Sequence, residues 1–151
     1  MSFDTNFDFT AEIQEYTNLR TTCQTTLDGV NAEINLMNAC IGYDEIKNGE
    51  LARLSLIQTR NSNLITGYTA TLSGISALQN LSGADKTILY NFWAFTGVSK
   101  ENYMCLMITN YSAMLSDADI LTIVVDNNNT TETKNHIGRL IISKYSVGEF
   151  C

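Results

Sequence analysis

Residues 9–41 have the sequence FTAEIQEYTNLRTTCQTTLDGVNAEINLMNACI, and their apolar pattern decides the fold class. Apolar or thiol side chains recur at alternating steps of four and three residues, with one charged exception, Arg20. The repeating positions are Phe9, Ile13, Tyr16, Arg20, Cys23, Leu27, Val30, Ile34, Met37 and Ile41. A repeat of this period is typical of the seam of a coiled coil. The pattern therefore predicts one long helix from about Phe9 to Ile41.

A second apolar stripe follows a turn predicted at Gly42 and Tyr43, after which the Asp44 carboxylate is placed to cap a helix. Its positions are Leu51, Leu54, Ile57, Leu64, Tyr68, Leu72, Ile75 and Leu78. This stripe is less regular than the first, but the chain contains no proline, so no residue forbids a helix of this length. We expect a second long helix that ends near residues 80–83.

The two predicted helices can be tested as a hairpin, because the residue numbers of antiparallel partners must have a constant sum. The seven apolar pairs that the turn creates, Val30 with Ile57 among them, all sum to 87 or 88. One register therefore satisfies the whole seam. Asn61, which would face Leu27, is a polar layer of the kind that commonly fixes register at some cost in stability. The sequence predicts a long antiparallel, coiled-coil-like hairpin over residues 9–82.

A stripe of small residues lies beside the apolar stripe on the second predicted helix, at Gly67, Ala70, Gly74 and Ala77. Glycine in a helix interior costs about 1 kcal/mol relative to alanine, so two of them favour close packing by another segment over indifference to local stability. The expected occupant is either the C-terminal part of this chain or a helix of a second copy. We therefore predict these four residues as a partner-binding surface.

Residues 84–151 are rich in aromatic side chains and methionine, and we expect shorter helices there. The first should end at Gly97, and Ser99 is a typical cap for the next, whose residues 103–115 are apolar nearly all round. The first helix carries an aromatic cluster, which consists of Tyr90, Phe92, Trp93 and Phe95. The cluster has two interpretations: core that covers the end of the hairpin, or the anchor of a protein–protein contact.

Residues 117–125 and 137–145 mix helix-compatible residues with β-branched ones, so helix and strand are both open for them. As strands, the two segments would form a small β-hairpin near residues 119–143. As a helix, the second would follow a cap at about Thr131 and end at Gly148. We expect a helix after Thr131 and leave the earlier segment undecided.

The chain has 151 residues, which is enough for one domain, and we expect a single mainly α domain over residues 1–151. Nine basic against 16 acidic residues give a net charge of −7, which repels phosphate backbones and anionic lipids. Nucleic acid and membranes are therefore not expected partners. The start of the chain lacks the pattern of a signal peptide, and no apolar run reaches the length of a membrane span. These observations favour a cytoplasmic protein or one within an assembled particle such as a virion.

No residue pattern in the sequence points to chemistry. The four cysteines are scattered without a CxxC pair and are expected to remain mostly reduced thiols. His136, the only histidine, has no cysteine or carboxylate near it at metal-site or triad spacing, and Asp117 and Asp119 are interpreted as surface charges. The glycines are too scattered for a phosphate-binding loop. The sequence predicts no catalytic residue, cofactor or metal.

Three hypotheses for function follow, from different classes. The first is a noncatalytic structural protein, a helical subunit that self-associates or binds other proteins in a larger complex such as a virion or phage particle. The alternative is a soluble monomeric adaptor or inhibitor that binds one partner helix in an apolar groove. The third is an enzyme that uses His136. Solution mass separates the first two, because an assembly subunit should self-associate and an adaptor should stay monomeric.

Overall fold

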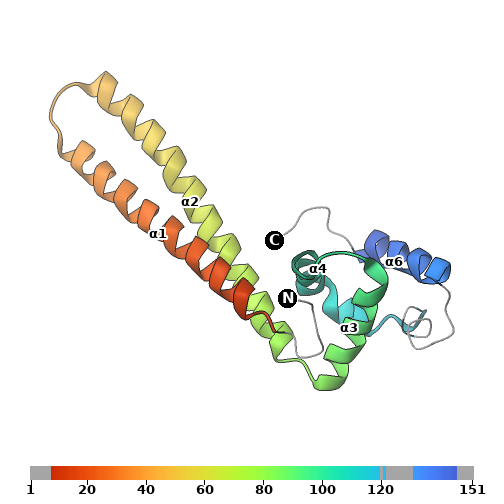
Figure 1. Cartoon of the computed structure of the whole chain (residues 1–151). Coiled ribbons are helices and arrows are strands. Elements are labelled where there is room, and N and C mark those ends of the chain that lie inside the picture. Colours follow the sequence, from red (N-terminus) through yellow and green to blue (C-terminus); the bar gives the residue numbers. More distant parts are fainter. Residues whose placement is uncertain (1–7, 120, 122–130, 146–151) are drawn as a thin grey trace. The chain divides into compact units, whose positions relative to one another are not determined.

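The computed structural model describes residues 8–119, 121 and 131–145. Within these residues it is mainly α, as predicted, and contains no strand. Its helices are α1 (Thr10–Ala39), α2 (Asp44–Gln79), α3 (Gly83–Thr96), α4 (Lys100–Leu115) and α6 (Thr131–Tyr145), shown in Figure 1.

Helix α6 confirms the prediction of a helix after Thr131. The alternative prediction, a β-hairpin that reaches residue 143, is therefore wrong. The physical reason is the spacing of its buried residues, because Ile137, Ile141 and Tyr145 are four residues apart and form one face of a helix. This period outweighs the β-branched composition of the segment. Most of residues 119–130, and Gly148, lie outside the described residues.

The chain divides into two compact units. The hairpin unit is Ile13–Leu72, and the C-terminal unit is Met1–Glu12 together with Ser73–Cys151. The boundary on α2 therefore falls within the helix, before the turn near residue 82 that the sequence suggested. The expectation of a single domain stays a prediction, and each unit is described here by itself.

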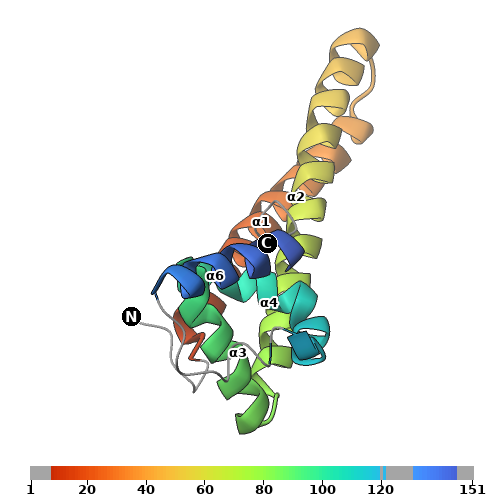
Figure 2. The ribbon, with the colours of Figure 1, turned by 90° about the vertical axis from the view of Figure 1, so that its right-hand side faces the viewer.

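The hairpin is confirmed, since α1 and α2 run antiparallel and side by side in two views at right angles (Figures 1 and 2). Two polar contacts between the helices report the register. The Asn31 Oδ1 accepts a hydrogen bond from the Gln58 Nε2 at 2.7 Å, and the Arg20 guanidinium donates to the Thr69 Oγ1 at 3.4 Å. The residue numbers of each pair sum to 89, within two of the predicted values, so these contacts agree with the predicted register.

In the hairpin unit, α1 buries only one of the two seam positions of each heptad. One residue per heptad is buried on α1, namely Tyr16, Cys23 and Val30, and the buried residues of α2 in this unit are Leu54, Asn61 and Thr71. The alternate seam positions of α1, such as Ile13, Leu27 and Ile34, are only half-buried. Two helices therefore close one side of the seam and leave the other partly open. The polar layer at Asn61 is satisfied within its own helix, because its Nδ2 donates to the Ile57 carbonyl at 2.9 Å.

The turn predicted at Gly42 and Tyr43 is confirmed, but α1 ends two residues earlier than the apolar pattern predicted. Helix α1 ends at Ala39, and the Ile41 side chain is 98% exposed, so the expectation that the seam reaches Ile41 is wrong. The reason is the reversal of the chain, in which Gly42 and Tyr43 have positive φ angles of 90° and 55°. Asp44 is then the first residue of α2.

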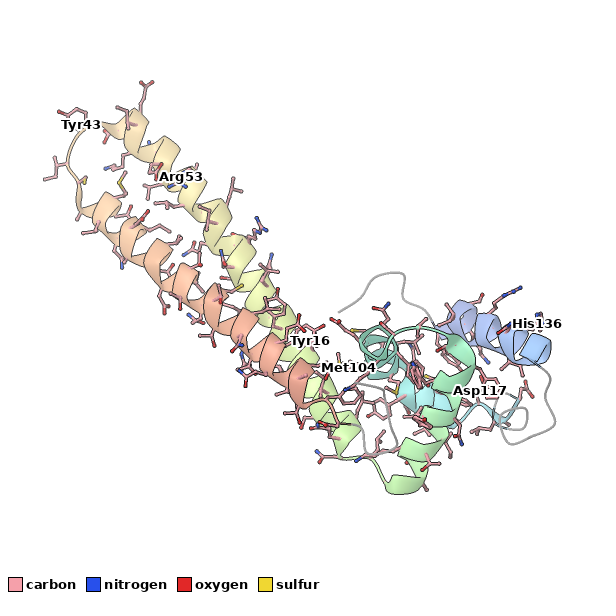
Figure 3. All side chains as sticks on the ribbon, viewed as in Figure 1. Tyr16, Tyr43, Arg53, Met104, Asp117 and His136 are labelled. Carbon is pink, nitrogen blue, oxygen red and sulfur yellow. The ribbon has the colours of Figure 1, made fainter. Side chains whose placement is uncertain are left out.

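The C-terminal unit is built from α3, α4 and α6, and its predicted helix ends are confirmed. Gly97, with a φ of 67°, ends α3, and the Ser99 hydroxyl caps α4 by accepting a hydrogen bond from the Asn102 N–H at 3.2 Å. Helix α4 is buried nearly all round, as expected. Its buried residues are Tyr103, Met104, Cys105, Leu106, Met107 and Met114. Figure 3 shows Met104 among the helices of this unit.

The backbone of α6 lies directly on the end of α3. A Cβ atom placed on Gly138 would come within 1.8 Å of the Phe95 carbonyl oxygen, closer than any side chain allows. A hydrogen bond within the unit also joins α3 to α4, because the Tyr103 hydroxyl donates to the Leu89 carbonyl at 2.7 Å. Burial raises the pKa of Tyr103 well above its ordinary value, so this hydroxyl stays protonated.

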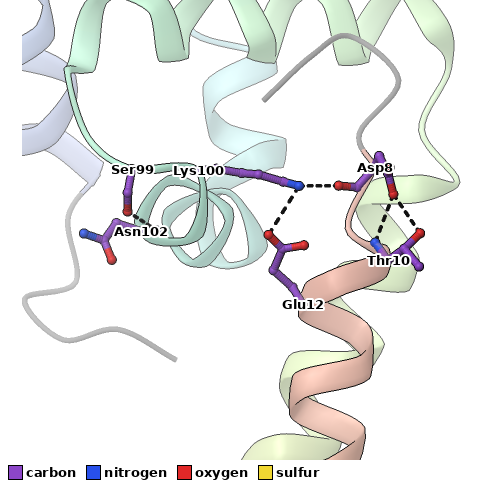
Figure 4. Close-up of polar contacts among 6 residues, drawn as sticks. All are labelled: Asp8, Thr10, Glu12, Ser99, Lys100 and Asn102. Carbon is purple, nitrogen blue, oxygen red and sulfur yellow. Dashed lines mark hydrogen bonds and ion pairs between the residues drawn. The ribbon is translucent and has the colours of Figure 1, made fainter. Parts of the chain in front are cut away.

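The start of α1 is fixed to α4 by Lys100 (Figure 4). Its ammonium donates to the Asp8 carbonyl, pairs with the Glu12 carboxylate at 3.3 Å, and lies 5.3 Å from the centre of the buried Phe9 ring. The Asp8 carboxylate in turn accepts from the Thr10 backbone N–H at 3.1 Å and caps α1. Hydrogen bonds from Thr10 lower the pKa of Asp8.

The cysteines differ from one another. Cys23 is buried in the hairpin seam and Cys40 is exposed near the turn, and both are free thiols. Cys105 is buried, as its apolar neighbours predicted, but it is disulfide-bonded. The expectation of a reduced thiol is therefore wrong for Cys105, because a disulfide depends on proximity in space, which cysteine spacing in the sequence does not reveal.

Candidate functional site

The predicted stripe of small residues is divided between two environments. A Cβ atom on Gly67 would meet no atom within 4 Å, and Ala70 is exposed. Gly74, in contrast, is covered by α4 of the same chain, since its Cβ would lie 2.4 Å from the Ile108 Cγ2 atom. Ala77 is half-buried. Within the C-terminal unit, Gly74 is thus packed against α4, whereas within the hairpin unit no atom lies close to Gly67.

The predicted aromatic cluster on α3 packs largely within the C-terminal unit. Phe92 is fully buried. The Tyr90 and Trp93 rings lie 5.8 Å apart, and the indole N–H of Trp93 donates to the Val98 carbonyl at 2.9 Å. Phe95 is half-buried beside Gly138. These contacts favour the core interpretation, and the cluster as a partner-binding surface stays a prediction.

A cavity of about 640 Å³ lies between the end of α3 and α6. Its lining includes Phe95, Gly97, Gly138 and the side chain of Arg139, which is the one charged residue in it. Gly138, whose backbone lies against the end of α3, is part of this lining. The cavity is a groove into which an apolar or weakly polar segment could lie.

A polar cluster joins the ends of α4 and α6, and sequence reasoning missed it. Asp117 is buried, so its interpretation as a surface charge is wrong. Its carboxylate accepts from the Lys144 ammonium at 2.6 Å and from the Tyr145 hydroxyl, while the Asn110 Nδ2 donates to the Tyr145 carbonyl at 2.6 Å. The partners of Asp117 lie 27 and 28 residues away, which no local pattern reveals.

The environment of this cluster shifts two pKa values. Burial, and then the hydrogen bond to Asp117, raise the pKa of Tyr145 to about 12. The hydrogen bond to Asp117 raises the pKa of Lys144 as well. Tyrosine therefore stays neutral and lysine stays charged at physiological pH, and the carboxylate is held by both. This arrangement fixes α6 to the end of α4.

The other candidates for chemistry are dispersed. His136 lies exposed on the first turns of α6 (Figure 3). Among residues 8–119, 121 and 131–145, no group of three histidine, cysteine or acidic side chains is arranged to hold a metal ion. None of the described helices is both long enough and apolar enough to cross a membrane.

The most conspicuous exposed apolar surface is at the turn end of the hairpin, over residues 36–56, which we call the hairpin end. Five of the seven exposed large apolar side chains in the described part of the chain lie here. They are Leu36 (70% exposed), Ile41 (98%), Tyr43 (84%), Ile46 (73%) and Leu56 (74%). Figure 3 shows Tyr43 at the turn and Arg53 beside it on α2.

Sequence reasoning did not select the hairpin end, although a signal was present. Leu36, Ile46 and Leu56 are apolar residues that do not belong to the heptad positions of either helix. Apolar residues outside a seam have no partner inside a two-helix hairpin, so their presence indicates a second surface. The seam itself drew Ile41 into the predicted core, which concealed it as a surface residue.

Comparison of the chain with models of protein families, with curated proteins and with solved structures gave no match. The surfaces of the two units and the chemistry of their side chains therefore remain as the basis for a functional proposal.

Proposed function

We propose that this chain is a noncatalytic structural protein whose helical hairpin mediates protein–protein contacts in a larger assembly. The observation that carries the proposal is the exposed apolar surface of the hairpin end. A fully exposed side chain of this size offers roughly 150–200 Å² of accessible surface, so the five residues together expose about 600–800 Å². The largest apolar patch of a typical monomer is about 300–600 Å².

The open side of the hairpin seam supports the same proposal. Ile13, Leu27 and Ile34 of α1 are only half-buried against α2. A third or fourth helix laid along this side would complete their burial, in the way that helix bundles close their cores. The hairpin unit therefore has both an apolar end and an apolar side on which another protein could pack.

The chemistry of the titratable clusters also favours a structural role. Asp117 is held by Lys144 and Tyr145, and Glu12 is paired with Lys100. In each cluster the charge joins two segments of the C-terminal unit. The proposed structural role requires proton transfer from neither carboxylate, and it does not use the exposed His136.

The solution mass of the full chain tests the proposal. Sedimentation equilibrium over a range of protein concentrations should give a mass above that of the monomer, and the mass should rise with concentration. A monomer at every concentration would contradict self-assembly and favour the adaptor hypothesis, for which the groove between α3 and α6 is the candidate binding site.

We also propose the kind of assembly and the compartment in which the protein acts. A virus or phage particle is one assembly of the proposed kind, and the cytoplasm is the compartment in which such a particle would be built. Cofractionation of the chain with particles purified from its source would test this placement.

A further inference from the structure

We propose that the hairpin end binds the hairpin end of a second copy of this chain, as a symmetric contact between two identical apolar surfaces. This inference rests on the proposed structural function and assigns the surface and the partner. The proposed contact uses neither the open half of the small-residue stripe nor the groove beside α6. Both remain available to other proteins.

The exposed area fits a contact between two copies. A stable interface buries about 800 Å² on each partner, and the hairpin end exposes about 600–800 Å² of apolar side chains. In a two-fold contact the same patch is used twice, so each copy both offers and covers this area. A contact that covers most of these side chains, together with the polar surface around them, would be of ordinary size.

Part of this surface is a stripe along α2. Ile46, Gly49, Arg53 and Leu56 are separated by steps of three, four and three residues, which places them on one side of the helix. A Cβ on Gly49 would meet no atom within 4 Å, so the backbone is accessible between the two apolar side chains. A facing helix can therefore approach closely at Gly49 while Ile46 and Leu56 pack on either side.

The charges at the hairpin end also suit a second copy. Residues 36–56 carry three acidic and two basic side chains, a net charge of −1, whereas the rest of the chain carries −6. Most of these charges are paired within the chain, since Lys47 lies 3.6 Å from Asp44 and Arg53 lies 2.5 Å from Glu50. Two copies that repel each other elsewhere can therefore meet here with little repulsion.

The same charges argue against a lipid surface as the occupant. Segments that bind anionic membranes carry clusters of lysine and arginine, each of which adds to the attraction. Lys47 and Arg53 are the two basic residues of the hairpin end, and both are engaged by carboxylates of the same helix. The apolar surface without a basic excess favours a protein, and the low net charge of the hairpin end allows that protein to be a copy of this chain.

The experiment compares two charge substitutions in the full chain by sedimentation equilibrium. Ile46→Glu places a like charge on both sides of the symmetric contact and should weaken self-association about 100-fold. Because Ile46 is exposed in the first turn of α2, where a carboxylate is favourable, the variant should keep the helix content of the wild type. Leu140→Glu adds the same charge at an exposed leucine of α6 and should leave self-association unchanged.

A second readout uses the free, exposed thiol of Cys40, which lies within the hairpin end. Its rate of alkylation should fall as the protein concentration rises, because the contact covers it. The Ile46→Glu variant should lose this protection, and Cys40→Ser identifies the signal from this thiol. Loss of mass and loss of protection in the same variant would support the contact.

The outcomes separate this inference from the proposed function. If the wild type self-associates but Ile46→Glu does not weaken it, the hairpin end is not the contact, while the structural function stands. In that case Gly67→Leu tests the open half of the predicted stripe. If the hairpin end binds neutral lipid vesicles, the second copy as its occupant is overturned. If the wild type is monomeric at every concentration, self-assembly is overturned as well.

Discussion

The hairpin unit and the C-terminal unit are both helical, but their helices are stabilised differently. Helix α4 is surrounded by other segments of its unit, and six of its 16 residues are buried. Helix α1 has three buried residues, Tyr16, Cys23 and Val30, along a much greater length. Isolated helices are marginal in water, so a helix depends on what covers its apolar face. The C-terminal unit supplies that cover itself, and the hairpin unit supplies only half of it.

The largest expected effect is on the core of the C-terminal unit. Phe92→Ala should lower the free energy of unfolding by about 3–5 kcal/mol, because a fully buried ring leaves a cavity. Urea unfolding followed by the fluorescence of Trp93, the only tryptophan, reports on this unit.

Leu56→Ala is the matched substitution at the hairpin end. Since Leu56 is 74% exposed, its loss should change the free energy of unfolding by no more than about 0.5 kcal/mol. Unfolding of the hairpin is followed by far-ultraviolet circular dichroism at a protein concentration that keeps the chain monomeric. Equal losses for Phe92→Ala and Leu56→Ala would remove the contrast between the two units.

Glycine substitutions sharpen the comparison of close packing with open surface. Gly138→Ala should destabilise the C-terminal unit by about 3 kcal/mol, because the new Cβ collides with the backbone oxygen of Phe95, which cannot move without α3. The same change at Gly67, where a Cβ meets no atom, should stabilise α2 by about 0.5–1 kcal/mol. Thermal unfolding of both variants measures this difference, and a stabilising Gly138→Ala would contradict the contact.

A charge in the hairpin seam should have a smaller effect, because the seam is partly open to water. Val30→Asp is expected to lower the free energy of unfolding by about 2 kcal/mol. The neighbouring substitution Asn31→Asp preserves the oxygen that accepts from Gln58 and should change little. Circular dichroism melting of the two variants compares them, and equal effects would mean that the seam is misassigned.

The sequence predicted the hairpin well because a coiled-coil seam is a local pattern that repeats. Each heptad adds an independent observation of which side of the helix is apolar, and the turn at Gly42 fixes the register. The error at Ile41 has the same origin, because periodicity continues in the numbering even where the chain has left the helix. Helix α1 ends at Ala39, and the residues with positive φ angles, Gly42 and Tyr43, follow it.

The C-terminal unit was less predictable because its contacts join distant residues. Asp117 has partners in α6, Gly138 meets the end of α3, and Lys100 holds the start of α1. None of these pairs has a characteristic spacing. The candidate surface was missed for a different reason, since the heptad pattern drew attention to the seam and the apolar residues outside it were not interpreted.

High pH should lower the stability of the C-terminal unit, and this effect should be smaller than those of the core substitutions. The unfolded chain loses the proton of Tyr145 near pH 10, whereas the folded chain keeps it until about pH 12. The unfolded state then binds fewer protons, so the stability present below pH 10 is lost as the pH rises through this window, by up to about 2 kcal/mol. The raised pKa values of Tyr103 and Lys144 act in the same direction.

Urea unfolding of the C-terminal unit at pH 9, 10 and 11 measures this loss through the tryptophan signal. Tyr145→Phe should reduce the slope of stability against pH, whatever its effect at neutral pH. An unchanged slope would mean that Tyr145 does not carry the shift.

The smallest expected effect concerns the backbone of the hairpin end, where Tyr43 combines an exposed ring with a positive φ of 55°. Tyr43→Ala removes the ring and retains a residue that avoids this conformation, whereas Tyr43→Gly removes both the ring and the strain. The glycine variant should be more stable than the alanine variant by about 0.5 kcal/mol. The relief of backbone strain outweighs the larger conformational entropy that glycine loses on folding. Both should weaken self-association, because both lose the ring. A tyrosine kept in the left-handed region is then explained by its contact with another copy and not by the fold, and equal self-association in all three proteins would contradict that explanation.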